Sequence, residues 1–76
     1  MEGMGTYKYR SGDVYEGEWS GDKKHGHGIF KNVDGSSLEG DYVKNKKNGE
    51  FIKVEASGKV HKIVYVDDEE KSRETL

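Results

Sequence analysis

The sequence has 76 residues and no cysteine; 37% of the residues are charged and 30% are hydrophobic. A chain of this length can form one small domain with a modest core, and the lack of cysteine excludes disulfides and thiolate metal sites. The formal net charge is −2, with the acidic excess in residues 67–76 and a nearly neutral body in residues 1–66. Because nucleic-acid binding depends on neutralising many phosphates, we expect no nucleic-acid partner.

The N-terminal residues, which begin Met1-Glu2, lack the basic and apolar segments of a signal peptide. No apolar run approaches the ~20 residues that a membrane-spanning helix needs. We therefore expect a soluble protein in the cytoplasm.

Glycines and aromatic residues return with a period of 23 residues. Gly12 aligns with positions 35 and 58, and Trp19 aligns with Tyr42 and Tyr65. A disordered chain has no reason to keep such a period, whereas a fixed period of 20–50 residues is typical of repeat proteins. The glycines to which we assign a structural role are Gly17, Gly26, Gly28, Gly35, Gly40, Gly49 and Gly58.

Within the first repeat, Tyr15, Gly17 and Trp19 alternate with Glu16 and Glu18, which is the two-residue period of a half-exposed strand. This pattern predicts an all-β fold: a single-sheet antiparallel β-meander of about six strands built from 23-residue hairpin repeats. The array is expected to occupy residues 1–66, with repeats near 15–37 and 38–60 and partial repeats at both ends. The expected strands lie near residues 5–10, 14–19, 27–32, 37–42, 49–55 and 60–66.

The last part of the chain departs from the repeat. Phe51 stands where the first repeat has Gly28, and Ile63 stands where it has Gly17, so we interpret residues 49–66 as a C-terminal cap. In residues 67–76 acidic side chains precede basic ones, an order that predicts a short helix. A disordered acidic tail is the alternative.

The stretch that carries Tyr15, Gly17, Trp19, Gly21, Lys23, His25, Gly26 and Gly28 resembles the MORN (membrane occupation and recognition nexus) repeat. The second copy departs from the pattern, with Leu38 in place of tyrosine, Asn48 in place of histidine and Phe51 in place of glycine. The resemblance implies an elongated, twisted single sheet with an aromatic groove, in a scaffold that binds proteins and self-associates. It also implies association with the cytoskeleton or with membranes, and phospholipid binding is a further property proposed for the family.

Candidate catalytic and metal-binding residues are few. His25 and His27 form a His-x-His pair, but the sequence supplies no cysteine to complete a metal site and His61 belongs to another repeat. Glu16 and Glu18 share one expected strand face, where a solvated surface is the simpler interpretation than an acid–base pair. We therefore predict no enzymatic activity, no metal and no cofactor.

The aromatic residues are the main candidates for function, because tyrosine and tryptophan are favoured anchors of protein interfaces. They predict a noncatalytic protein–protein interaction module, or scaffold, that binds a peptide or helix in a groove. The alternative is that the rings only pack against the glycines and one another. The predicted groove consists of Tyr7, Tyr15, Trp19, Phe30, Tyr42 and Tyr65, with Tyr9 adding to the aromatic area.

The lysines near two expected turns favour another function, weak peripheral binding of anionic phospholipids. Their edge would consist of Lys23, Lys24, Lys44, Lys46 and Lys47. At about 1 kcal/mol for each basic residue, such an edge gives a weak, salt-sensitive attachment. Lysines that only keep the turns soluble are the simpler interpretation. Two further hypotheses are homo-association through the unpaired strand near residues 5–10 and a chain that belongs to the regulatory repeat array of a larger enzyme.

Overall fold

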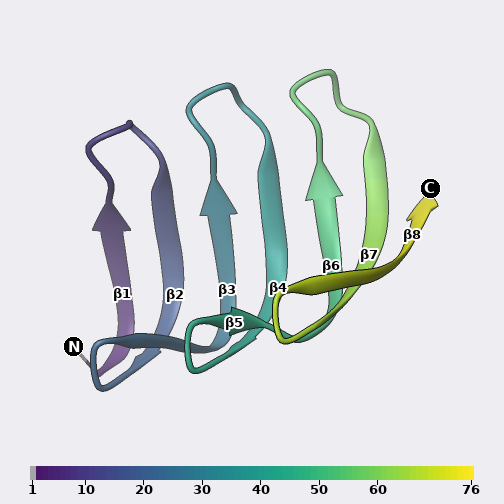
Figure 1. Ribbon diagram of the computed structural model, residues 1–76. Coiled ribbons are helices and arrows are strands. Elements are labelled where there is room, and N and C mark those ends of the chain that lie inside the picture. The colour runs from purple at the N-terminus through teal and green to yellow at the C-terminus, as the bar shows by residue number, and fades with distance from the viewer. Residues whose placement is uncertain (1) are drawn as a thin grey trace.

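The computed structural model describes residues 2–76, which form one open antiparallel sheet (Figure 1). Neighbouring strands follow in the order β1-β2-β3-β4-β6-β7-β8, and the short β5 pairs with β4. The predicted all-β meander is therefore confirmed. The strands are β1 (Gly3–Lys8), β2 (Val14–Ser20), β3 (Lys23–Lys31), β4 (Ser37–Val43), β5 (Lys46–Lys47), β6 (Gly49–Val54), β7 (Val60–Val66) and β8 (Glu69–Thr75).

The structure has two strands more than the six expected, β5 and β8. Strand β5 pairs back onto β4, and β8 pairs back onto β7. Strand β3 runs without a break through nine residues. The same positions one repeat later are divided at Asn48 into β5 and β6. One repeat further, β8 begins at the equivalent position, Glu69. The 23-residue period thus continues through Thr75.

The expectation of a helical or disordered tail at residues 67–76 is wrong. Asp67 and Asp68 have φ values of 48° and 72°, close to the 49° and 74° of Lys44 and Asn45 one repeat earlier. Two successive residues with positive φ form a tight hairpin turn, which returns the chain along β7 instead of starting a helix. The buried His61 on β7 holds β8 in place through a 3.1 Å hydrogen bond to Thr75 Oγ1.

The turns at the opposite end of the hairpins repeat with the same hydrogen bond. The backbone amides of Tyr9, Asn32 and Glu55 each donate to the carbonyl four residues later at 2.8 Å. In each turn, the third residue after the one that donates this amide is a glycine with φ near +100°. Other residues adopt this backbone conformation only at a cost in free energy. The third of these turns lies beyond residue 50 and has the same geometry as the first two.

Glycines make space for rings on one side of the sheet. Gly17 pairs with Gly28, and Gly28 with Gly40, so the three glycines form a row across β2, β3 and β4. The ring of Tyr15 lies over Gly28, where a Cβ atom would be 2.5 Å from the Tyr15 Cζ atom. A Cβ atom on Gly40 would be 2.6 Å from the Phe51 Cγ atom.

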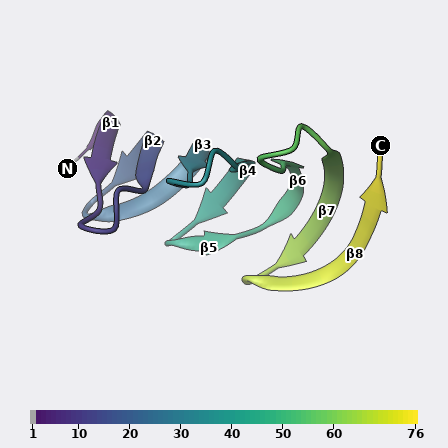
Figure 2. The ribbon, with the colours of Figure 1, turned by 90° about the horizontal axis from the view of Figure 1, so that it is seen from above.

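The sheet is a single curved layer when it is seen from above (Figure 2). Its core is a continuous ladder of aromatic rings on the side where the glycines make space. Successive rings meet edge to face with centroids 5.2–5.4 Å apart, the arrangement that aromatic pairs prefer. Tyr15 and Phe51 are fully buried, as is the aliphatic Ile63 on β7. The ladder consists, in order, of Trp19, Tyr15, Tyr42, Phe51 and Tyr65.

Candidate binding face

The sheet face that carries the rings is concave, because the lower hairpin ends, with β5 and β8, cross in front of it (Figure 1). We call this surface the ring face. A hollow of about 470 Å³ lies at its N-terminal end, and a second of about 330 Å³ lies beside it. Both are lined by Lys24 and Asn45, so the two hollows adjoin. The remaining lining residues are Tyr7, Tyr9, Trp19 and Asp22 in the first hollow, and Phe30, Asn32, Leu38, Tyr42, Lys47 and Asp68 in the second.

The six predicted groove residues divide into two groups. Tyr15, Tyr42 and Tyr65 are 0%, 5% and 8% exposed, so they support the face from within and offer almost no surface to a ligand. Tyr7 is 48% exposed, and Trp19 and Phe30 are partly buried. The glycines allow the first group to sink into the sheet, which is why only part of the predicted groove is accessible.

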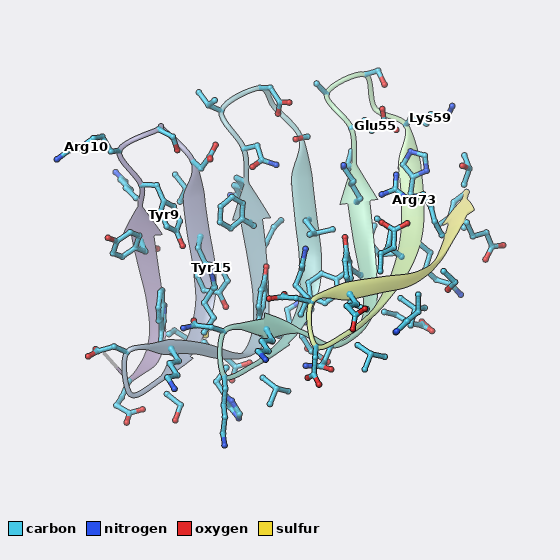
Figure 3. All side chains as sticks on the ribbon, viewed as in Figure 1. Tyr9, Arg10, Tyr15, Glu55, Lys59 and Arg73 are labelled. Carbon is cyan, nitrogen blue, oxygen red and sulfur yellow. The ribbon has the colours of Figure 1, made fainter. Side chains whose placement is uncertain are left out.

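The accessible rings form a cluster at the N-terminal end of the face. The ring of Tyr7 lies 4.7 Å from that of Tyr9 and 6.3 Å from that of Trp19, while Tyr9 lies 5.4 Å from Phe30. The Trp19 indole is held by a 3.3 Å hydrogen bond from Nε1 to the carbonyl of Gly5. Figure 3 shows Tyr9 and Tyr15 on this half of the face. The cluster is thus anchored on its strands.

The five predicted lysines do not form one edge. Lys24 turns toward the rings, with Nζ 5.4 Å from the centroid of Tyr15 and 5.5 Å from that of Tyr42, and donates a 3.5 Å hydrogen bond to Tyr9 Oη. Lys47, one repeat later, lies with Nζ 4.1 Å above Tyr65. Lys23, Lys44 and Lys46 are exposed. Adjacent residues of a strand point to opposite faces, so one lysine of each pair joins the ring face.

The opposite face carries the acidic residues, as the alternation predicted. The His27 ring lies 2.8 Å from Glu39 and 3.2 Å from Asp41, and hydrogen bonds to these carboxylates raise the pKa of His27. His25, the other half of the His-x-His pair, accepts a 3.3 Å hydrogen bond from the Lys44 amide. Glu39 and Asp41 contact different nitrogens of the His27 ring, and across residues 2–76 no three histidine or acidic side chains are placed so that they could hold one metal ion.

The second and third hairpin tips, residues 44–45 and 67–68, are each hydrogen-bonded to the strand that follows the preceding tip, a contact that the sequence did not reveal. Asn45 Oδ1 accepts a 2.8 Å hydrogen bond from the Lys24 amide, and the Asn45 amide donates at 2.9 Å to the Lys24 carbonyl. Asp68 makes the same pair of bonds to Lys47, at 2.8 Å and 3.0 Å. An asparagine or aspartate in the second tip position is the signal that would have identified the contact. These bonds fix the backbone that carries Lys24 and Lys47.

An open sheet of repeated hairpins, with partly exposed rings on its concave face, defines an interaction module of the repeat type. The MORN repeat family model matches residues 1–14, 15–37 and 39–50, and the chain belongs to this family. MORN repeats are noncatalytic modules that interact with proteins and membranes. No curated protein matches the sequence. The described part of the chain has no helix that is long and apolar enough to span a membrane.

Proposed function

We propose that this chain is a noncatalytic protein-interaction module that binds a peptide or helix of a partner protein on its ring face. The observation that carries the proposal is the 48% exposure of Tyr7 beside Trp19, at the open hollow of about 470 Å³. Exposed tyrosine and tryptophan side chains that line a hollow are the residues most often found as energetic anchors of interfaces.

The buried rings favour this function because they keep the accessible ones in place. Trp19 meets Tyr15 edge to face at 5.2 Å and is hydrogen-bonded to the Gly5 carbonyl. A ring that is already ordered loses little side-chain entropy when a partner covers it. The ring face is therefore preorganised for binding a partner.

Site-specific photocrosslinking tests the proposal. A benzophenone amino acid at Tyr7 faces the hollow, whereas the same group at the adjacent Thr6 faces the other side of β1 and is the matched control. We expect crosslinks to a defined partner segment from position 7, and their loss when Trp19 is replaced by alanine. Equal crosslinking from positions 6 and 7 contradicts binding at the ring face.

Binding of anionic phospholipids is the second candidate, supported by the exposed Lys23, Lys44 and Lys46 at two hairpin tips. Three lysines at about 1 kcal/mol each give a weak attachment that salt abolishes. We expect little flotation with phosphatidylserine vesicles at physiological salt. Tight flotation that persists after the three lysines are changed to glutamate excludes this electrostatic attachment.

A further inference from the structure

Two lysine ammonium groups lie on the ring face without a carboxylate partner. Lys24 Nζ is 5.4–5.8 Å from the centroids of three rings, and Lys47 Nζ is 4.1 Å from that of Tyr65. Within residues 2–76, neither ammonium forms an ion pair. Asp68 lines the hollow with both lysines and accepts the Lys47 backbone amide at 2.8 Å, but it forms no ion pair with either ammonium. The two positive charges are therefore available to an acidic ligand.

The spacing of the two lysines favours a helix as that ligand. They occupy equivalent positions of consecutive repeats on β3 and β5, two strands apart, so their Cα atoms are about 10 Å apart at the usual strand separation. Residues seven apart on one side of an α-helix are separated by about 10.5 Å. Side chains on one side of an extended peptide are separated by about 6.6 Å or 13 Å, so an extended ligand fits this spacing less well.

We infer that the ring face selects an amphipathic helix that presents two carboxylates seven residues apart, one to Lys24 and one to Lys47. Apolar side chains of the helix pack on Phe30 and Leu38, which line the same hollow as the two lysines. This inference rests on the function proposed above and adds the chemistry of the partner. Charge-assisted hydrogen bonds from the lysines give the helix its register.

The position of the two lysines favours a helix over a membrane. Both line a hollow that the tip residues Asn45 and Asp68 also line, and both are half-buried, whereas Lys44 and Lys46 are exposed. A planar bilayer meets the exposed tip lysines Lys44 and Lys46 first. An α-helix, about 10 Å across, can enter the hollow that Lys24 and Lys47 line, whereas a planar bilayer cannot.

Selection from a displayed library of helical peptides, randomised along one face for three turns, tests the inference on the full chain. We expect the selected peptides to carry Asp or Glu seven residues apart. For the best peptide, changing both acids to their amides is expected to weaken binding about tenfold, measured by fluorescence anisotropy. Lys24→Met or Lys47→Met should remove most of that difference, whereas the matched controls Lys23→Met and Lys46→Met should leave it unchanged.

The outcomes separate this inference from the proposed function. Selected helices that compete at the ring face but lack paired acids, or that lose nothing on amidation, overturn the inference and leave the proposed function standing. A library that yields no peptide dependent on Trp19 contradicts both. Capture of phosphatidylserine vesicles that is lost in Lys24→Met, with no helix selected, overturns the inference in favour of a membrane ligand.

Discussion

The ring of Phe51 lies over Gly40 and takes the place in the aromatic ladder that Tyr15 takes one repeat earlier. Tyr15 reaches from β2 over Gly28 on β3 and fills the gap before Tyr42. Phe51 reaches in the opposite direction, from β6 over β4, and fills the gap after Tyr42. The second repeat has thus exchanged the positions of ring and glycine without interrupting the ladder.

This exchange predicts that the two halves of the second repeat are energetically coupled. Phe51→Gly alone removes a fully buried ring and should cost about 3–5 kcal/mol, the usual range for loss of such a ring. Leu38→Tyr alone adds a ring where Phe51 already lies and should cost about 1–3 kcal/mol. The double variant restores the tyrosine-over-glycine arrangement, so its cost should be at least 1 kcal/mol below the sum.

Urea denaturation of the four proteins measures this coupling. If Phe51→Gly alone is unfolded, the return of a cooperative thermal transition in the double variant provides the same evidence. If the loss of stability in the double variant equals the sum of the losses in the two single variants, the side chains at positions 38 and 51 do not compete for one place in the ladder.

Gly28→Ala should destabilise the sheet by pressing on Tyr15. Its Cβ atom would lie 2.5 Å from Tyr15 Cζ, and overpacking of this kind costs about 1–3 kcal/mol. The melting temperature should fall by about 4–8 °C for each kcal/mol of stability that is lost in a domain of this size. Tyr15→Leu should relieve most of the effect of Gly28→Ala.

The matched control for Gly28 is Gly58→Ala. Gly58 has a φ of +96° and an open space where its Cβ atom would lie, so its cost comes from backbone strain alone. Tyr15→Leu should leave that cost unchanged. If Tyr15→Leu reduces the destabilisation caused by both glycine substitutions, or by neither, the packing argument is contradicted.

The period determined how much of this fold the sequence could predict. Alternation around Tyr15 and Trp19 placed β2 correctly, and the same pattern around Tyr42 placed β4. The tail was mispredicted because Asp67 and Asp68 were interpreted by their charge, whereas by position they are the third tip and share the backbone conformation of Lys44 and Asn45.

The binding face was harder to predict than the strands. Alignment position showed that Phe51 replaces a glycine but not that its ring returns over Gly40, because ring direction depends on the neighbouring strand. Lys23 and Lys24 look equivalent in the sequence, but as neighbours on β3 their side chains point to opposite faces of the sheet. A long lysine side chain can extend into solvent or fold over rings, and the sequence does not distinguish the two.

The tip contact predicts a local effect of Asn45. Asn45→Gly keeps the φ of 74° accessible but removes the 2.8 Å bond to the Lys24 amide, so it should cost about 0.5–1.5 kcal/mol. Asn45→Ala adds strain and should cost about 1 kcal/mol more. Hydrogen exchange of the Lys24 amide should accelerate in both variants. Unchanged exchange at Lys24 would show that the contact contributes nothing.

Alkaline pH should unfold the protein through its buried tyrosines. Burial raises the pKa of Tyr15 to about 12 from 10.0, and it also raises the pKa of Tyr42. The unfolded chain ionises near pH 10, so the stability contributed by the protonated Tyr15 phenol is complete below pH 10 and is lost as the pH rises toward about 12.

The measurement is the free energy of unfolding in urea, compared between about pH 9 and about pH 11, with phenolate absorbance as a second signal. Tyr15→Phe removes one of the groups that titrate, so its stability should fall less steeply over this interval than that of the unmodified chain. Tyr7→Phe is the matched control, because Tyr7 is 48% exposed. A slope that Tyr7→Phe flattens as much as Tyr15→Phe would show that burial in the ladder is not the cause.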